Sequence, residues 1–454
     1  MLDVRRSVLR VVVKRIAFLL LTGSHVHGAE VEGASPLLLT HANIVNVNTG
    51  KIASDQSVLI REGKIVSVMP SMDSKGKSDD IVLDIQGRFL IPGLWDMHVH
   101  DDTASHTEQI YFPLFIANGV TGIRDMFSQC ADPCPTPELF PDLRAIRRRV
   151  EDRILLGPHI IISSPLLDGP KSAWPGAARI ATPKDATRAV DTAAQKGADF
   201  IKVYNGLPRN AYFVVAAESK KLGIPFAGHV PYSVTLVEAS DAGQRSVEHL
   251  MGMEQACATA SACEKVAIHL SQNGTWQTPT LVVSRFFACP QIVANRNDPR
   301  LTYIWSEQKK SWDQTPPADA AASTCEANYQ RLESFVRTLH AAHAKFLVGT
   351  DLGNPYIFPG FSVHDEMALL VNAGLTPLEA LQAATINPAR YLDGELTAGT
   401  VAPGRSADLV VLDENPLADI RNISRINSVV VRGQLFDRAA LDKMLEGARA
   451  AALQ

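Results

Sequence analysis

The alternation of apolar and polar residues divides the chain into a β-rich beginning and end and a mixed middle. Residues 37–90 contain short apolar runs separated by turn residues, as in SVLIREGKIVSVM, where a hairpin is expected at Arg61 to Lys64. The same pattern returns after Gly399, in GTVAPGRSADLVVLDENP and INSVVVRGQLFD. Short runs of this kind, bounded by turns, are typical of antiparallel strands. We therefore predict that residues 36–91 and 396–437 together form one small β-sandwich domain.

The middle of the chain, residues 92–395, alternates apolar runs with helical stretches. Thr-Pro pairs, which suit an N-cap and the first helical position, begin two predicted helices, Thr182 to Lys196 and Thr376 to Arg390, and a third helix is predicted from Asn210 to Leu222. Strands that alternate with helices predict an α/β fold, here a TIM-like (β/α)8 barrel. The eight strand-like runs are GLWDMHVH, GVTGIRDM, PHIIISS, DFIKVY, PFAGHV, RSVEHL, WQTPTLVV and FLVGTD.

The last two runs are separated by a long polar segment, residues 284–345, rich in Asp, Gln, Ala and Pro. A simple barrel does not need an insertion of this length. We expect it to add helices beside or over the barrel mouth.

Titratable residues fall at the ends of several predicted strands, where barrel enzymes carry their functional side chains. His98 and His100 are two residues apart, so the alternation of a strand points both imidazoles to the same side. His229, His249 and Asp351 end the fifth, sixth and eighth runs. Each feature alone has an ordinary structural explanation, such as a core histidine or a helix cap. Their joint placement at corresponding strand ends favours a metal site.

The fourth run, DFIKVY, has Lys202 in the middle of an expected buried strand. Burying an unpaired ammonium is costly, so this lysine requires a partner or a modification. Four histidines and one carboxylate exceed the three protein ligands of a typical catalytic zinc. We therefore predict two divalent ions, zinc first, with manganese, cobalt and nickel as alternatives. A carbamate, formed when the Lys202 amine reacts with carbon dioxide, would be an anion able to bridge both ions.

With PGLWDMHVH, DFIKVY, GHVP, VEHL and GTD in this order, and AATINPAR near the end of the barrel, the chain resembles the amidohydrolase superfamily. The resemblance is to the binuclear branch with a carboxylated lysine, among prolidase-like and imidazolonepropionase-related members. It implies that Lys202 bridges the two ions, whereas mononuclear relatives, including many deaminases, have no such lysine. The implied ligands are His98, His100 and Asp351 for the buried metal, and His229 and His249 for the more exposed one.

The resemblance also implies a function: hydrolysis of a C–N amide or peptide bond, in a dipeptide or an N-acyl amino acid, by a metal-bridging hydroxide. Asp351 would be the catalytic group that transfers a proton to the leaving amine. Two alternatives stay open: a hydrolase of a cyclic amide, lactone or phosphoester, and a metal-binding protein without catalytic activity.

Four further residues are candidates for substrate binding, because a cation or a phenol near the mouth could hold a substrate carboxylate. The alternative for Arg124 is an ion pair with a neighbouring acid, and for His364 a place at a helix start. The four candidates are Tyr204, Arg124, Tyr232 and His364.

Composition narrows the partners further. A net charge of -4 and 20% charged residues give no bias toward polyanions, so a small-molecule substrate is expected and nucleic acid is not. A homo-oligomer stays open. Residues 1–28 combine basic residues, a short apolar run and a small-residue site, which is the layout of a signal peptide, and the apolar run is too short for a stable membrane span. We expect a secreted or periplasmic protein; a disordered leader or a different start codon is the alternative.

The six cysteines fit an oxidising compartment. Two pairs, Cys130 with Cys134 and Cys257 with Cys263, flank short loops that a disulfide could close. Cys289 and Cys325 could form a third bond. The spacing of a zinc ribbon is absent.

Overall fold

The computed structural model describes residues 36–73, 76, 80–289, 295, 297–313 and 322–454. The predicted signal peptide, residues 1–28, lies outside the described residues. The described residues belong to one compact unit.

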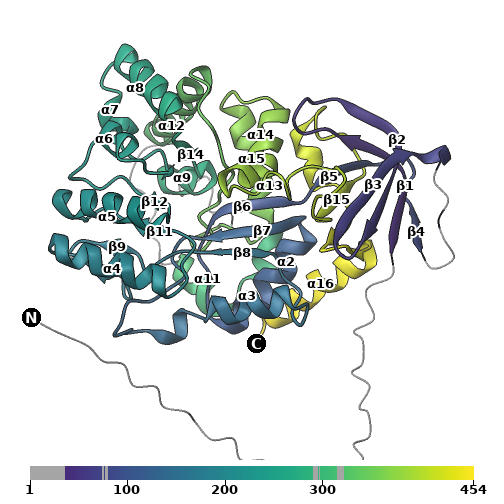
Figure 1. Ribbon diagram of the computed structural model, residues 1–454, viewed down its shortest axis with the longest axis horizontal. Helices are drawn as coiled ribbons and strands as arrows, with labels where there is room; N and C mark the ends of the chain where they lie inside the picture. Colours follow the sequence, from purple (N-terminus) through teal and green to yellow (C-terminus); the bar gives the residue numbers. More distant parts are fainter. Residues whose placement is uncertain (1–35, 74–75, 77–79, 290–294, 296, 314–321) are drawn as a thin grey trace, which may run out of the picture. The chain divides into compact units, whose positions relative to one another are not determined.

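The strands and helices follow one another along this unit as Figure 1 shows. The strands are β1 (Leu37–Val45), β2 (Ile52–Arg61), β3 (Lys64–Pro70), β4 (Ile81–Asp84), β5 (Phe89–Pro92), β6 (Leu94–Val99), β7 (Val120–Asp125), β8 (His159–Ile162), β9 (Leu167–Asp168), β10 (Ala178–Arg179), β11 (Ile201–Val203), β12 (Phe226–Gly228), β13 (Ser246–Glu248), β14 (Trp276–Thr278), β15 (Leu409–Leu412), β16 (Ile426–Val431) and β17 (Gln434–Phe436). The helices are α1 (Ala104–His106), α2 (Phe112–Ala117), α3 (Leu143–Glu151), α4 (Pro183–Gln195), α5 (Arg209–Leu222), α6 (Leu236–Asp241), α7 (Met253–Ala256), α8 (Ala260–Asn273), α9 (Leu281–Ala288), α11 (Ser306–Asp313), α12 (Ala322–Ala341), α13 (Phe361–Asn372), α14 (Pro377–Ala384), α15 (Ile386–Tyr391) and α16 (Arg438–Ala451), with short helical turns η1 (Ser71–Asp73), η2 (Thr107–Tyr111), η3 (Pro137–Leu139), η4 (Pro299–Tyr303) and η5 (Ile420–Ser424).

The two ends of the described chain build one sheet, in the order β17-β16-β15-β5-β1-β2-β3, with β4 paired to β1. The predicted pairing of the N- and C-terminal segments is therefore present, with all of these strands in a single sheet, and their arrangement as a sandwich stays a prediction. This sheet curls onto itself: the Ile65 amide of β3 donates to the Arg405 carbonyl at 2.9 Å, and the Ala407 amide donates to Gly63 at 2.9 Å. The enclosed core includes Leu39 and Leu409.

The middle of the chain has the α/β architecture expected of a TIM-barrel-like fold. Its strands are parallel and lie in two sheets, β6-β7-β8 and β10-β9-β11-β12-β13-β14. They do not form one continuous closed sheet, although single backbone hydrogen bonds join the sheets, such as Ser164 N–H to the Phe200 carbonyl at 2.9 Å. Seven of the eight expected runs contain one of these strands; β9 and β10 were not expected.

The last two expected runs differ from the prediction. The seventh stops being a strand at Thr278, and Leu281 already begins α9. The eighth, residues 346–351, forms no regular strand, yet it lies between two strands, since Leu347 N–H donates to Gln277 at 2.9 Å and Met97 N–H donates to Val348 at 2.8 Å. Asp96 anchors its end by accepting from the Thr350 hydroxyl at 2.6 Å.

Local capping explains where the predicted helices begin. Thr182 and Thr376 each accept from the backbone amide three residues on, and the acid at that position bonds back, which is a capping box with proline at the first position. The third predicted helix is α5. The single helix expected up to Arg390 is instead α14 and α15, because Thr385 leaves helical geometry and its hydroxyl donates to the Leu381 carbonyl.

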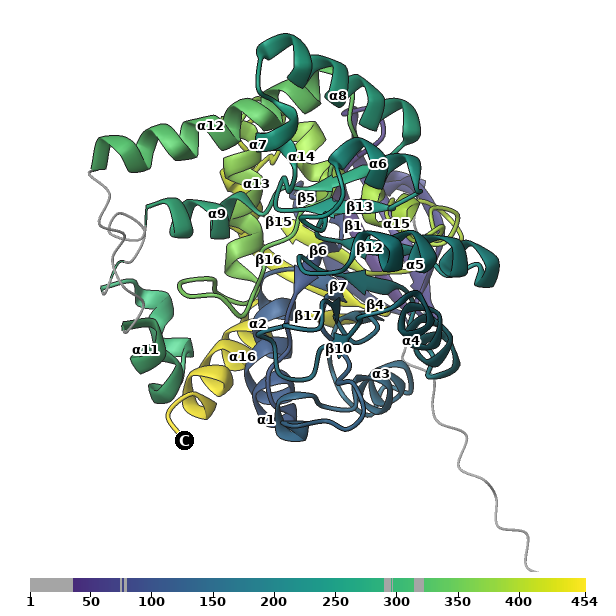
Figure 2. The ribbon, with the colours of Figure 1, turned by 90° about the vertical axis from the view of Figure 1, so that its left-hand side faces the viewer.

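The insertion is helical in its described part, as expected, and contains most of α9 together with α11 and α12. Figure 2 shows these three helices on one side of the barrel strands. The three expected disulfides are all present: Cys130–Cys134, Cys257–Cys263 and Cys289–Cys325, the last of which links the end of α9 to α12. None of the helices in the described ranges is long and apolar enough to cross a membrane.

Candidate metal centre

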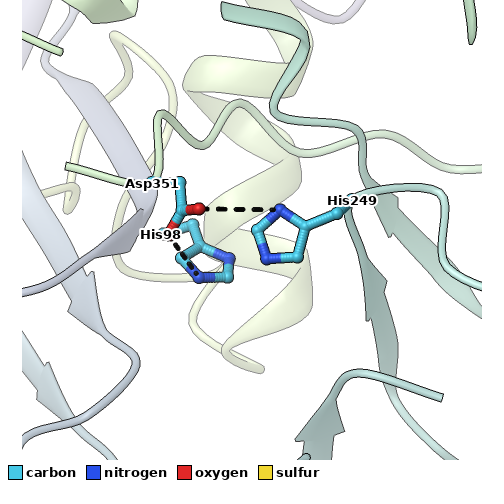
Figure 3. Close-up of side chains that lie close together, drawn as sticks. All are labelled: His98, His249 and Asp351. Carbon is cyan, nitrogen blue, oxygen red and sulfur yellow. Dashed lines mark ion pairs between the residues drawn. The ribbon is translucent and has the colours of Figure 1, made fainter. Parts of the chain in front are cut away.

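Three of the predicted ligands meet at one point, which Figure 3 shows: His98 from β6, His249 just after β13, and Asp351 at the end of the eighth run. One ligand atom of each lies within 4.8 Å of the others. The Asp351 carboxylate is 3.3 Å from His98 Nε2 through Oδ1 and 3.9 Å from His249 Nδ1 through Oδ2. Imidazole nitrogen and carboxylate oxygen at such separations match the ligand set of a divalent transition metal.

The other predicted ligands surround this cluster. His100 Nε2 lies 3.0 Å from Asp351 Oδ1, and the His229 ring centre lies 4.8 Å from that of His249. Lys202, on β11, lines the same cavity as His100, His229, His249 and Asp351. The structure thus brings together all six predicted ligands, while their assignment to two separate metals stays a prediction.

Each of three histidines has its Nδ1 within hydrogen-bonding distance of an acceptor. The partners are Glu248 Oε2 for His98 at 3.0 Å, Asn205 Oδ1 for His229 at 2.8 Å, and Thr280 Oγ1 for His249 at 2.6 Å. The Thr280 hydroxyl also lies 2.8 Å from the Pro279 carbonyl, to which it can donate. The Glu248 carboxylate can only accept, so His98 carries its proton on Nδ1 and has a free lone pair on Nε2, as metal coordination requires.

Two nitrogens of the cluster, His98 Nε2 and His100 Nδ1, are buried and make no hydrogen bond to the described residues. Orphaned buried polar atoms are rare and call for a physical reason. A metal ion would satisfy the His98 nitrogen, because its other nitrogen is already engaged by Glu248. The residues present therefore fit a metal.

Burial keeps these imidazoles neutral. It holds the pKa of His98 and of His229 well below the ordinary value, with further lowering by Lys202 and by neighbouring histidines. Burial also lowers the pKa of His249, although the Asp351 charge opposes the shift. For Asp351, burial raises the pKa, but His249, His100 and Lys202 outweigh it and the net pKa is lowered. Neutral imidazoles beside an ionised carboxylate are the protonation states that bind metal.

Backbone strain accompanies the cluster. Among non-glycine residues, His249, Thr280 and Asp351 have φ angles of 59°, 47° and 60°, in the left-handed region. Such residues cost energy and gather where the surrounding structure fixes a side chain for function. The strain here sits on two predicted ligands and on the partner of one of them.

Lys202 is 1% exposed and stands beside the imidazoles with no ion pair to any described carboxylate within 4.0 Å. Burial lowers its pKa to about 8, even though the charges of Glu248 and Asp351 raise it. A sizeable fraction of the amine is therefore neutral near that pH, and the neutral amine is the form that reacts with carbon dioxide.

Arg124 does not bind at the mouth, which corrects one prediction. Its side chain is fully buried, and its guanidinium donates to both oxygens of Glu248 at 3.0 Å and to the Tyr391 hydroxyl at 2.8 Å. The Ser246 hydroxyl completes this network on Glu248. The ion pair with an acid, left open as the alternative, is what the structure contains; the acid is the residue that orients His98.

Tyr232 and His364 also fall outside the cavity. Tyr232 is 78% exposed and does not line it. His364 lies in the first turn of α13, as its alternative reading expected, and its Nε2 is 2.9 Å from the Asn118 carbonyl. His229 and Asp351 reach the cluster because they lie at the ends of the fifth and eighth barrel runs. Tyr232 and His364 lie on the segments that follow these runs, and their side chains do not enter the cavity.

Of the four substrate-binding candidates, Tyr204 alone lines the cavity, which has a volume of about 600 Å³. Its ring lies over His229 with 4.1 Å between ring centres. Sequence reasoning missed Asn205, Glu248 and Thr280. A signal existed for Glu248. Arg124 and Glu248 carry opposite charges and both lie on strands expected to be buried, and a buried charge is rarely found without a partner.

The comparison with family models decides the classification: the amidohydrolase family model matches residues 89–436. The chain belongs to the amidohydrolase family. Two solved structures share its fold. One is a protein from Bifidobacterium longum named as a prolidase, at 23% identity over 91% of this chain and 99% of that one, with a TM-score of 0.70. The other is a bottromycin amidohydrolase, at 24% identity over 91% of this chain and 90% of that one, with a TM-score of 0.73.

Two sequence relatives carry the names of other enzymes. An adenine deaminase from Ruegeria pomeroyi is 23% identical over 88% of this chain, and a dihydroorotase from Carboxydothermus hydrogenoformans is 42% identical over 22% of it. The chain spans 56% of the length of the first and 23% of the length of the second.

Proposed function

We propose that this amidohydrolase is a binuclear metal enzyme that cleaves the amide bond of a dipeptide or an N-acyl amino acid. The observation that carries the proposal is Lys202, a buried lysine that forms no ion pair with a described carboxylate and lines one cavity with three of the histidines and Asp351. As a carbamate it would be an anion facing that set, and zinc is the metal that the donor atoms suit first. The fold shared with the Bifidobacterium longum protein named as a prolidase agrees with this substrate class.

The side chains have distinct tasks in this proposal. Two divalent ions held by His98, His100, His229, His249, Asp351 and the Lys202 carbamate would activate water and polarise the scissile carbonyl. Asp351, ionised and 3.0 Å from His100 Nε2, would accept a proton and pass it to the leaving amine. Tyr204 and the cavity around it would hold the substrate.

The test combines metal analysis with a substrate screen. We expect about two equivalents of zinc-like metal per chain, loss of activity on chelation, and turnover of members of dipeptide and N-acyl amino acid libraries. Asp351→Asn should lower kcat by roughly 10²–10⁴ while the variant keeps most of its metal. Turnover near the wild-type rate in Asp351→Asn would refute the role of this carboxylate.

Lys202→Ala is the matched variant for the bridge. It should lose metal content, and added short carboxylates should restore part of the activity by replacing the carbamate. Unchanged metal stoichiometry in this variant would contradict the carbamate.

A second candidate reaction is deamination, which the likeness to adenine deaminase over most of this chain favours. It differs in its product, because ammonia would be released from a purine rather than an amine or amino acid from an amide. Assaying ammonia release from adenine alongside the amide libraries separates the two reactions.

We also propose that the protein is secreted or periplasmic. Three disulfides support an oxidising compartment, since cytosolic thiols are kept reduced. Expression with residues 1–28 intact and sequencing of the mature N-terminus would test it; retention of the whole leader in the cytoplasm would refute it.

A further inference from the structure

A continuous row of aromatic side chains leads from the rim of the cavity to the candidate metal centre. Phe140 packs edge to face on Phe127 with 4.9 Å between ring centres, and Phe127 meets Trp174 at 6.4 Å. Trp174 meets Tyr204 at 6.2 Å, and Tyr204 lies 4.1 Å from His229. All four aromatic residues line the cavity, on loops that follow β7, β9 and β11.

The loops that carry this aromatic row are fixed to each other. Ala131 N–H donates to the Gly176 carbonyl at 2.7 Å, which ties the disulfide loop Cys130–Cys134 to the loop of Trp174. Gly176 has φ +79°, and a Cβ there would lie 2.8 Å from both Cys130 Sγ and the Phe140 ring. A glycine at this position lets the two loops pack closely, so the row is formed before any substrate arrives.

The outer part of the row is open to solvent. Trp174 is 47% exposed, and two other apolar residues that line the same cavity, Leu139 and Phe287, are 49% and 57% exposed. Large apolar side chains gathered around one opening mark a binding site rather than a core. If Trp174 served only to pack the protein interior, its side chain would be buried.

We infer that the substrate carries a large planar aromatic group within one residue of the scissile amide, and that Trp174, Phe127 and Phe140 bind this group. Aromatic pairs prefer the edge-to-face and offset arrangements that the row already offers to a further ring. A cavity of about 600 Å³ has room for such a group besides the amide itself. The inference rests on the proposed amide hydrolysis and narrows its substrate.

Two matched substrate pairs test the inference with the metal-loaded full chain. N-(2-naphthoyl)glycine against N-acetylglycine places the ring on the acyl side, and N-acetyltryptophan against N-acetylalanine places it on the leaving side. In at least one pair the wild type should have the higher kcat/KM for the aromatic member. Trp174→Ala should lower that aromatic-to-small ratio by about tenfold, the size expected for one aromatic contact with its buried area.

The control variant is Tyr232→Ala, which also removes an exposed aromatic ring but outside the cavity, and it should leave the ratio unchanged. Equal kcat/KM for both members of each pair, or a loss in Trp174→Ala that is the same for both members, overturns the inference. Thermal melting checks that both variants are folded.

Calorimetry separates a failure of this inference from a failure of the proposed function. If the wild type cleaves none of the four compounds, the proposed amide hydrolysis fails for them. The binding of 2-naphthoate then tests the aromatic site by itself. Binding that Trp174→Ala weakens about tenfold supports the aromatic site. No binding of 2-naphthoate to the wild type overturns it.

Discussion

The histidines on the two sides of the cluster have different kinds of hydrogen-bond partner. On the closed side, His98 contacts Glu248, whose charge is matched by Arg124, and all three side chains are at most 1% exposed. On the open side, His229 and His249 contact neutral acceptors, the amide of Asn205 and the hydroxyl of Thr280, next to the cavity. The histidine ring is therefore oriented by a buried ion pair on one side and by neutral hydrogen bonds on the other.

Because of this difference, substitutions on the two sides should affect stability and metal affinity differently. A buried ion pair costs desolvation, and removing one partner leaves an uncompensated charge, so the closed side is sensitive to any change. Neutral hydrogen bonds contribute about 0.5–1.5 kcal/mol each and can be lost without leaving a buried charge. We expect the closed side to control folding and metal retention together, and the open side to tune metal affinity alone.

The largest effect should come from Arg124→Met, which keeps an apolar side chain of similar length but leaves Glu248 buried and unpaired. We expect the free energy of unfolding to fall by about 3–5 kcal/mol, measured by denaturant titration of the metal-free protein. Arg245→Met is a matched control, since both guanidiniums lie 5.0 Å from the Tyr391 ring centre. Arg245 pairs with Asp393, which is 77% exposed, so its loss should cost about 1 kcal/mol or less. Equal losses of unfolding free energy in the two variants would contradict the view that the buried ion pair makes the closed side sensitive.

The same contrast explains what the sequence could predict. The positions of His98, His229 and Asp351 around one point were predictable because these residues lie at or near the ends of barrel runs, and strand ends in such folds converge. Arg124 was misassigned because it also ends a strand, and nothing local distinguishes a side chain that points under the cluster from one that points into the cavity.

The β-rich part shows a similar limit. Its strands were predictable from their alternating pattern, but whether they form a sandwich or one curled sheet depends on contacts such as Ile65 with Arg405, which are distant in sequence. The eighth barrel run was recognisable in the sequence although it forms no regular strand. Its apolar residues are buried between the neighbouring strands, and it ends at Asp351 in the histidine cluster. The aromatic row depends on how three loops pack, and no periodic pattern encodes that.

The second effect concerns Glu248→Gln, which keeps the size of the side chain and an oxygen for His98 Nδ1 but removes the charge. We expect metal to bind roughly 10–100-fold more weakly, measured by competition with a chelator, because partners that orient a ligand have effects of this size. The variant should also be destabilised, since Arg124 is left unpaired. The double variant Arg124→Met/Glu248→Gln separates the two losses: stability should partly return, and metal affinity should not. Recovery of both would mean that Glu248 acts through folding alone.

The smallest effect should be that of Thr280→Val on the open side. Valine is β-branched like threonine, so the strained backbone at φ 47° is kept, while the acceptor for His249 Nδ1 is lost. No charge is uncovered, so we expect metal affinity to fall less than about tenfold and the unfolding free energy of the metal-free protein to change by about 1 kcal/mol or less. Thr280→Ser, which retains the hydroxyl, should bind metal like the wild type. A loss of metal affinity in Thr280→Val as large as in Glu248→Gln would show that charge is not what separates the two sides, and that the open side holds its metal as firmly as the closed one.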